Sequence, residues 1–389
     1  MLQRIVSDQL LRLSRQYPVV TVTGPRQSGK TTLCRSLFKD KIYVNLESLA
    51  ERNFAQADPR GFIARYPEGA VLDEIQRAPD LLSEIQVDVD EKQENGRFIL
   101  TGSSNFDMLA KASQSLAGRT ALLRLLPFSY GEIARDHAAL SQDDILYTGL
   151  YPRIYDQMLN PSQAASFYIS TYLERDVRTI LNVKDLGSFE LFLRLCAGRT
   201  AQVMNMSSLS GELGISHNTV KQWLAVLEDS FIIRLLRPYH ANINKRMVKS
   251  PKLYFLDTGL ACFLLGIQSA GQLATHPLRG ALFETFAFSE LTKARFNAAL
   301  PDSMFFYRDQ GGLEIDFVMD YGVDCEAIEV KSARALHPDF FANLRKFTAL
   351  HPAVRKSWLL YGGEDSVEYL GSRAVGWREF GSALLPGVL

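Results

Sequence analysis

Residues 17–33, YPVVTVTGPRQSGKTTL, form the stretch that most limits what this chain can fold into. The run from Val19 to Thr23 is mostly β-branched and predicts a buried strand, and a helix is expected to begin at Lys30. Between them lies the spacing G-x-x-x-x-G-K-[ST], whose glycines let backbone N–H groups curl around phosphate oxygens at a helix N-terminus. This stretch therefore predicts a nucleotide-binding phosphate loop. Its expected binding residues are Gly24, Gln27, Ser28, Gly29, Lys30, Thr31 and Thr32.

A second segment supplies acidic partners for that loop. Residues 68–79, EGAVLDEIQRAP, predict a short buried strand that ends in Asp73 and Glu74. In a phosphate-loop enzyme, Lys30 reaches the β- and γ-phosphates, and Thr31 and Asp73 hold Mg²⁺. Glu74 at the strand's end can polarise the attacking water. The pattern predicts ATP binding and hydrolysis rather than nucleotide binding alone.

Three further runs predict strands that complete a five-stranded parallel sheet, at 42–47, 96–106 and 120–128. Ligands of such sheets bind at the carboxyl ends of the strands. Polar residues follow the 96–106 strand at that edge, and any of them can sense the γ-phosphate or the water. The candidates are Ser103, Ser104 and Asn105, and the sequence does not choose among them.

Composition bounds the class of protein and its partners. A chain of 389 residues predicts two or three domains, and 47% apolar with 22% charged residues is typical of globular proteins. Lys plus Arg equal Asp plus Glu at 43 each, so any nucleic-acid surface must be local. The four cysteines form no CxxC pair, which argues against zinc and disulfides and fits a reducing compartment. Since no apolar run reaches ~18 residues, we expect a cytoplasmic protein without a membrane span.

The middle of the chain predicts helices followed by a winged-helix module. Residues 131–200 look largely helical, and 207–233 predict two helices around Gly214 with a cap at Ser216. A wing strand is expected at 231–239, and 234–252 carry six Lys or Arg and no acid, including Lys245 and Arg246. This favours contact with DNA, and less with RNA, over a protein-packing role, which stays open. Outward residues of the second helix are His217, Asn218, Lys221 and Gln222.

The C-terminal part carries a second acidic pattern. An amphipathic helix with Glu284 is expected at 279–296, and two strands at 313–320 and 325–333 are expected to pair antiparallel. Strict alternation places Leu313, Ile315 and Phe317 on one face and brings Asp316 beside Glu329 and Lys331. Carboxylates so placed can bind Mg²⁺ or Mn²⁺ and activate water. Two interpretations stay open: a metal-dependent nuclease centre, or charges on the solvated face of a hairpin.

Several of these motifs resemble known families. Residues 1–130 resemble an AAA+-type ATPase core of the class with an additional strand and a catalytic Glu, and residues 116–133, LAGRTALLRLLPFSYGEI, resemble one prokaryotic family of such ATPases. In that family a nuclease-like domain follows the core. Asp316 with Glu329-Val330-Lys331 is similar to the PD-(D/E)XK fold, with Glu284 as a further acidic ligand, although Ile315 stands where a Pro is common.

The resemblance implies a fold class and a function. The fold is α/β, with an AAA+-type core at 1–130, a helical connector at 131–200, a winged helix at 201–250 and a nuclease-like domain at 251–389. Arg119 is an arginine-finger candidate acting in trans, which implies a homo-oligomer; otherwise it is a surface residue that caps a turn. The expected function is ATP hydrolysis coupled to action on nucleic acid, with a metal-dependent nuclease site. The alternative is an ATP-driven switch whose C-terminal domain binds a partner without cleavage.

Overall fold

The chain divides into two compact units, which are described separately. The computed structural model describes residues 2–103, 116–173, 177, 186–239 and 250–383. The first unit comprises Met1–Phe128 with Asp229–Phe231 and Arg295–Leu300. The second comprises Ser129–Glu228, Ile232–Ala294 and Pro301–Leu389. No helix in these described ranges combines the length and apolarity needed to cross a membrane.

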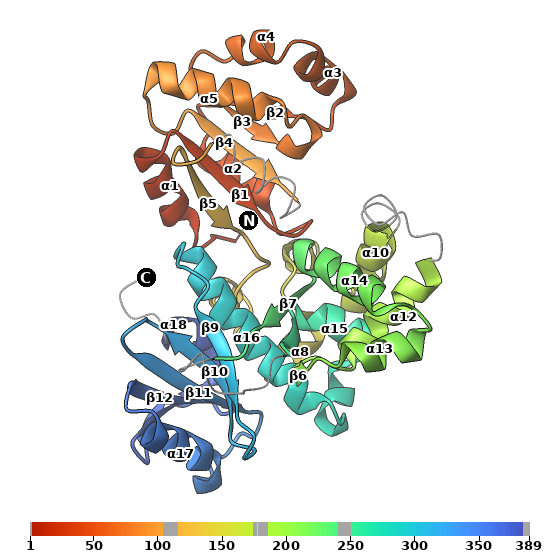
Figure 1. Ribbon diagram of the computed structural model, residues 1–389, viewed down its shortest axis with the longest axis vertical. Coiled ribbons are helices and arrows are strands. Elements are labelled where there is room, and N and C mark those ends of the chain that lie inside the picture. The colour runs from red at the N-terminus through yellow and green to blue at the C-terminus, as the bar shows by residue number, and fades with distance from the viewer. Residues whose placement is uncertain (1, 104–115, 174–176, 178–185, 240–249, 384–389) are drawn as a thin grey trace. The chain divides into compact units, whose positions relative to one another are not determined.

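A five-stranded parallel sheet forms the centre of the first unit, as the sequence predicts (Figure 1). Its strand order is β2-β3-β4-β1-β5, with every neighbouring pair parallel. Parallel strands buried on both faces read as continuous apolar runs, which is why local sequence located them well. Their bounds are β1 (Val19–Thr23), β2 (Ile42–Asn45), β3 (Ala70–Asp73), β4 (Phe98–Gly102) and β5 (Thr120–Arg124).

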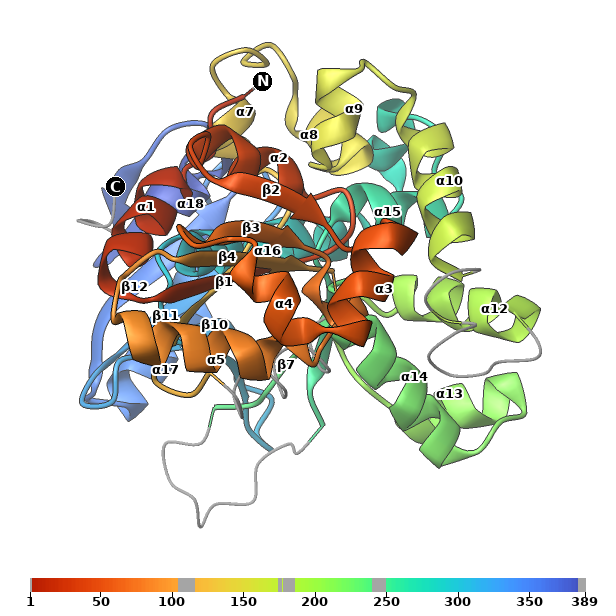
Figure 2. The same cartoon turned by 90° about the horizontal axis from the view of Figure 1, so that it is seen from above.

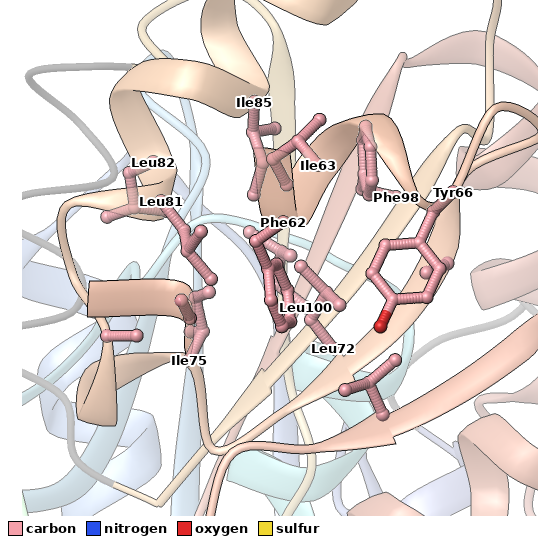
Figure 3. Close-up of a cluster of buried hydrophobic side chains, with 14 of the residues drawn as sticks. Phe62, Ile63, Tyr66, Leu72, Ile75, Leu81, Leu82, Ile85, Phe98 and Leu100 are labelled. Atoms are coloured by element: carbon pink, nitrogen blue, oxygen red, sulfur yellow. The ribbon is translucent and has the colours of Figure 1, made fainter. Parts of the chain in front are cut away.

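Helices cover both faces of this sheet (Figure 2). One face packs against α1 (Ser7–Gln16) and α2 (Lys30–Leu37), with Leu10 and Leu33 in the shared core. The other packs against α3 (Leu49–Ala57), α4 (Pro59–Ala64) and α5 (Leu81–Lys92). Figure 3 shows the Phe62 ring in the middle of that second core, with Leu81 and Leu100 on either side. Burying a ring of this size contributes about 1.5–3 kcal/mol. The cores on both faces therefore stabilise the sheet whose edge carries the phosphate loop.

The first half of the second unit is mainly helical. Two of its helices, α13 and α14, join at Gly214, which takes the left-handed conformation that a glycine adopts without strain. Three short strands form an antiparallel sheet in the order β6-β8-β7. The helices are α7 (Tyr130–Ile133), α8 (Gln142–Thr148), α9 (Pro152–Asp156), α10 (Pro161–Tyr172), α12 (Leu186–Ala197), α13 (Met206–Leu213), α14 (His217–Asp229) and α15 (Thr258–Leu264). The strands are β6 (Gln202–Val203), β7 (Ile233–Leu236) and β8 (Lys252–Phe255).

A six-stranded mixed sheet, in the order β13-β14-β12-β11-β10-β9, forms the rest of the second unit. Strands β9, β10 and β11 pair antiparallel, whereas β11, β12 and β14 run parallel. Residues of α17 pack on one face beside Ile315 and Ala327. The elements are α16 (Arg279–Asn297), β9 (Met304–Arg308), β10 (Glu314–Asp320), β11 (Cys325–Lys331), α17 (Ala342–Leu350), β12 (Val354–Tyr361), β13 (Val367–Tyr369), β14 (Ser372–Gly376) and α18 (Phe380–Ala383).

Strand β10 breaks the strict alternation that the sequence predicts. It pairs antiparallel with β11 as expected, but its pairing with β9 shifts register between Ile315 and Val318. Such an irregularity changes which side chains share a face. Ile315 and Val318 consequently share one core, while Phe317 packs against Tyr254 and Phe288. The prediction that Ile315 and Phe317 lie on one face is therefore wrong.

Helix α16 is also less amphipathic than its sequence predicts. Residues 285–293 are all buried, including its charged side chains. Glu290 and Lys293 pair at 3.0 Å, and Glu290 accepts a 2.9 Å hydrogen bond from the backbone N–H of Tyr130. Internal partners thus replace the water that an exposed face would supply.

Candidate functional site

The phosphate loop connects β1 to α2 through two glycines that no other residue replaces easily. Gly24 has a φ of 153°, and a Cβ there would lie 2.0 Å from the carbonyl oxygen of Leu125. Gly29 has a φ of 92°, and Gln27 is also left-handed with a φ of 61°. A backbone with these angles curls rather than extends. Such a curved loop can turn successive N–H groups toward one anion.

Lys30 is folded into this loop. Its ammonium donates to the carbonyl oxygens of Gly24 at 2.9 Å and Pro25 at 2.7 Å. Burial lowers the pKa of Lys30 to about 8, although the charges of Glu74 and Asp73 act in the opposite direction. Among the described residues the ammonium bonds to these two neutral carbonyls, which it can exchange for phosphate oxygens.

Asp73 ends β3, and its carboxylate accepts hydrogen bonds from hydroxyl groups of three elements. Thr31 Oγ1 donates to its carboxylate at 2.9 Å and the Tyr43 hydroxyl at 2.6 Å, and Thr101 also bonds it. Burial, followed by the hydrogen bond to Asp73, raises the pKa of Tyr43. The sequence pairs Asp73 with Thr31 but misses Tyr43 and Thr101, which lie on the flanking strands. Thr101 lies near the carboxyl end of β4, which is a sequence signal, whereas Tyr43 is the second residue of β2 and carries no such signal.

Glu74 lies one residue beyond the strand in a left-handed conformation, with φ 60° and ψ 46°. Gln76 Nε2 donates to its carboxylate, and Ser103 Oγ contacts the same oxygen at 3.3 Å. Gln76 also donates to Ser103 at 3.2 Å. Of the three sensor candidates, Ser103 therefore meets Glu74, while Ser104 and Asn105 lie outside the described residues. Gln76 was not predicted from sequence.

Arg4 braces the phosphate loop from the N-terminal segment. Its guanidinium donates to the carbonyl oxygens of Ser28 and Leu126, both at 2.7 Å, and lies 4.9 Å from the Phe128 ring centroid. The Ser28 hydroxyl is buried and has no hydrogen-bond partner in the described part of the chain. Nothing in the local sequence around Arg4 signals this contact.

These residues fit Mg²⁺ and ATP. Lys30 and the loop N–H groups suit phosphate oxygens, and the unpartnered Ser28 hydroxyl adds a further polar group at the loop. The Thr31 hydroxyl and the Asp73 carboxylate are the oxygen donors that Mg²⁺ prefers. Thr32 follows on the exposed side of α2.

Arg119 lies at the opposite end of the sheet. Its carbonyl oxygen accepts a 3.2 Å hydrogen bond from Val19, the first residue of β1, whereas the phosphate loop follows the last. A five-residue strand separates the two ends by roughly 16 Å. The guanidinium instead pairs with Asp90, with one N–O distance of 2.8 Å. Arg119 therefore does not reach the phosphate loop of its own chain.

A second group of charged residues lies in the second unit. The carboxylate cluster is defined here as Glu284, Glu314, Asp316 and Glu329. Asp316 and Glu329 are 8% and 2% exposed, so the interpretation of charges on a solvated face is wrong. Val330 donates its backbone N–H to Asp316 at 2.9 Å, and Lys331 pairs with Glu329 at 2.8 Å. The structure thus brings Asp316, Glu329 and Lys331 close together.

A lysine that the sequence analysis did not single out enters this cluster. Lys252 Nζ lies 2.6 Å from Glu314 Oε1, 3.3 Å from Glu284 Oε1 and 3.7 Å from Asp316 Oδ1. Tyr254 also donates to Glu284, at 2.5 Å. Lys252 belongs to the basic segment 234–252, but its side chain is buried among carboxylates rather than exposed. Its only sequence signal is a place two residues before Tyr254 on a short apolar strand.

Burial shapes the electrostatics of the cluster. It raises the pKa of Glu284 to about 7 and, with the neighbouring Asp316, raises that of Glu329 well above its ordinary value. Burial alone would lower the pKa of Lys252, but the charges of Glu284, Asp316 and Glu314 outweigh it and the pKa rises. Lys252 is therefore an ammonium ion held by carboxylates.

The predicted metal ligands Glu284, Asp316 and Glu329 do not form a metal site. In the ranges that the structure describes, no group of three or more His, Cys, Asp or Glu side chains is placed to hold a metal ion. The ammonium of Lys252 lies among these oxygens instead. The donor set therefore does not fit Mg²⁺ or Mn²⁺ as it stands.

The outward face of α14 is as expected. Its four predicted outward residues, His217, Asn218, Lys221 and Gln222, are all exposed. Of the basic segment that follows, Arg237 is exposed and Arg234 pairs with Asp302. Lys245 and Arg246 lie outside the described residues, as do residues 174–176 and 178–185 of the connector.

Sequence comparisons place the chain among known proteins. It is 32% identical over 334 residues to the uncharacterized protein Rv2008c of Mycobacterium tuberculosis and, equally, to the uncharacterized protein Mb2031c of Mycobacterium bovis. Each match covers 85% of this chain and 74% of the mycobacterial protein. The chain belongs to their family.

Three family descriptions divide the chain. Residues 16–134 match an AAA domain, residues 139–271 match a domain of unknown function (DUF8612), and residues 279–380 match another (DUF4143). The chain therefore carries an AAA-type phosphate-loop ATPase domain. The boundaries predicted at 130, 200 and 250 stay predictions. Lys252 falls in the second of these matches and all four carboxylates in the third.

Solved structures include a similar archaeal protein. The Walker-type ATPase PABY2304 of Pyrococcus abyssi is 17% identical to this chain, with a TM-score of 0.48. The match covers 67% of this chain and 94% of that one.

Proposed function

We propose that this protein is an ATP-driven switch that acts on nucleic acid. The contact of Thr31 with Asp73 at the edge of the sheet carries the ATPase part of this proposal, because it joins the two oxygen donors for Mg²⁺. Lys30 binds the β- and γ-phosphates, and Glu74 polarises the attacking water. Bound Mg²⁺ neutralises charge on the phosphates. The match of residues 16–134 of this chain to an AAA domain supports these roles.

ATP hydrolysis is tested by phosphate release from the full chain and its Lys30→Ala variant. Lys39→Ala, an exposed lysine just after α2, is the matched control. We expect activity in the wild type and the control, and its loss in Lys30→Ala because the phosphates lose their ammonium partner. Equal activity in all three proteins would overturn the proposal.

Nucleic acid is the proposed target, with DNA favoured over RNA. Helices α13 and α14 meet at a tight turn and are followed by the antiparallel pair β7 and β8, an order typical of winged helices. The exposed polar face of α14 supports contact with phosphates. A module that packs only against protein is the alternative, and it predicts no salt-dependent binding of DNA.

We also propose a homo-oligomer in which Arg119 acts on a neighbouring chain. Its distance from the phosphate loop of its own chain supports a role in trans over a role in cis. The neighbouring chain would then supply the arginine finger.

A metal-dependent nuclease is the second candidate function, favoured by the proximity of Asp316, Glu329 and Lys331, and it requires that a metal ion displace the ammonium of Lys252. The test is cleavage of single-stranded, duplex and branched DNA and of RNA in Mg²⁺ or Mn²⁺, with and without ATP. Cleavage that Asp316→Ala and Lys331→Ala abolish would establish the nuclease. Absence of cleavage alongside ATP hydrolysis and DNA binding would establish the switch.

A further inference from the structure

Lys252 is held rigidly at its backbone. It is the first residue of β8, and there it pairs with Val203 of β6 on one side and Leu236 of β7 on the other. Its side chain is 3% exposed, and its ammonium lies 5.6 Å from the Phe306 ring centroid. A central strand and a buried stem leave the ammonium little freedom to leave the carboxylate cluster.

The carboxylates around it are held as well. Glu284 accepts from Tyr254 at 2.5 Å, and Asp316 accepts from the backbone of Val330 at 2.9 Å. Glu314 faces Arg308 at 3.7 Å in addition to Lys252. The three oxygens therefore have fixed positions around one cationic centre.

We propose that Lys252 takes the place of a divalent cation, so that the carboxylate cluster binds no Mg²⁺ or Mn²⁺. The N–H donors of Lys252 reach Glu314 and Glu284, and Asp316 at 3.7 Å is held by charge alone. A divalent ion bound to the same oxygens would lie within a few ångströms of that charge and would be repelled. The chain's own Lys252, Lys331 and Arg308 then face the carboxylates in place of a metal ion.

This inference does not depend on ATP hydrolysis, because the phosphate loop belongs to the other unit. A chain that hydrolyses ATP and binds Mn²⁺ at the cluster would contradict the role of Lys252 alone. A chain that does neither would contradict the ATPase proposal alone.

The experiment is Mn²⁺ titration of the full chain without nucleotide, followed by electron paramagnetic resonance. All proteins carry Thr31→Ala, which removes one of the two metal donors of the ATP site, and Asp316→Asn then identifies the Mn²⁺ that is bound at the cluster. With Lys252 intact, we expect the Thr31→Ala protein to bind the same amount of Mn²⁺ with and without Asp316→Asn. We expect Lys252→Met to gain one Mn²⁺ site. Its affinity for Mn²⁺ at the cluster should exceed that of the protein with Lys252 by at least about tenfold, because a positive charge beside the metal is gone. Adding Asp316→Asn to Lys252→Met should abolish that site.

Two controls separate this result from a general change in charge. Lys346→Met removes an exposed lysine of α17 and should leave Mn²⁺ binding unchanged. Lys252→Arg keeps the positive charge and should bind no Mn²⁺. A Lys252→Met protein that folds, as shown by circular dichroism, and binds no more Mn²⁺ than Lys346→Met overturns the proposal.

Proteins that keep Lys252 also test the proposal, without the Lys252→Met variant. If Lys252→Met fails to fold, the comparison of the Thr31→Ala protein with its Asp316→Asn version remains. Mn²⁺ binding that Asp316→Asn removes overturns the proposal, and the absence of such binding supports it.

Discussion

Glu74 combines an unusual backbone with a restrained side chain. A non-glycine residue in the left-handed region costs on the order of 1 kcal/mol, which the surrounding fold must offset. Here Gln76 and Ser103 both bond the carboxylate, and the end of β3 fixes the turn. The side chain is therefore held at the carboxyl edge of the sheet, beside the hydroxyl cluster around Asp73.

Glu74→Gln should separate ATP binding from ATP hydrolysis. The amide cannot accept a proton from water, so we expect the turnover number to fall by about 10²- to 10⁴-fold. Binding of a fluorescent ATP analogue should be unchanged, because Lys30 and Thr31 are intact. Glu91→Gln, an exposed glutamate at the end of α5, is the control. Normal turnover in Glu74→Gln would remove Glu74 as the base.

Glu329 predicts a pH dependence of stability. Burial, Asp316 and Glu284 raise its pKa above the ordinary 4.5, while Lys331 opposes them. The folded state thus binds this proton more tightly than the unfolded chain. Its stabilising contribution is complete below about pH 4.5 and is lost as pH rises through the raised pKa.

The comparison of Glu329→Gln with wild type measures that loss. The amide cannot ionise, so the variant should gain stability relative to wild type as pH rises from about 5 to about 8. Urea unfolding at several pH values gives the difference, and Glu368→Gln on the exposed strand β13 is the control. A difference independent of pH would mean that Glu329 titrates normally.

Sequence reasoning at this scale succeeds where contacts are local or belong to a motif. Lys30 and Thr31 could be assigned because the spacing within the loop fixes their relation, and Asp73 because it ends a buried strand at the ligand-binding edge. Tyr43 and Thr101 lie 30 and 28 residues from Asp73, and no short pattern links them to it. Lys252 could not be found for the same reason, since it is 32 residues from Glu284 and farther from Asp316.

At the scale of elements, α14 is the most informative surface. Its buried side carries Val220, Leu224 and Leu227, which leaves Lys221 outward in the second turn of the helix. A lysine in that position can neutralise a phosphate without reading a base.

Lys221→Ala should weaken DNA binding about equally for all sequences. Loss of one phosphate contact should reduce the slope of log affinity against log salt by about 1. Fluorescence anisotropy at several salt concentrations measures both quantities, with Lys346→Ala as the control. An unchanged slope would place the DNA contact elsewhere or remove it.

Regular elements could be predicted and irregular ones could not. The strand β1 is rich in β-branched residues, β3 begins with three apolar residues, and Gly214 marks the turn between α13 and α14, so each signal lies within the element. The register shift in β10 depends on its pairing with β9, which local alternation does not contain. The burial of α16 depends in the same way on partners such as Tyr130, distant in sequence.

At the scale of the whole molecule, Arg119 connects ATP hydrolysis to assembly. It lies at the end of the sheet opposite the phosphate loop and pairs with Asp90 on the surface. If a neighbouring chain receives this arginine, hydrolysis belongs to the assembly rather than to one chain.

Mixing two inactive variants tests this directly. Arg119→Ala keeps its phosphate loop and Lys30→Ala keeps its arginine, so each alone should lose most activity, about 10³-fold or more for the arginine. Their mixture should recover part of it, and wild-type activity per chain should rise with concentration. Asp90→Asn, which removes only the surface partner, should stay active. A fully active monomer, or a fully active Arg119→Ala variant, would contradict the role.

The position of Lys252 also has a consequence for recombination between related proteins. The lysine lies in one matched domain of unknown function and its carboxylate partners lie in the next. A recombinant that takes these two segments from different relatives, one without the lysine, would leave Glu284, Glu314 and Asp316 without the counter-charge of Lys252. Breaking a buried pair in this way costs about 3–5 kcal/mol. The two segments are therefore expected to be transmitted together, as a single unit of exchange.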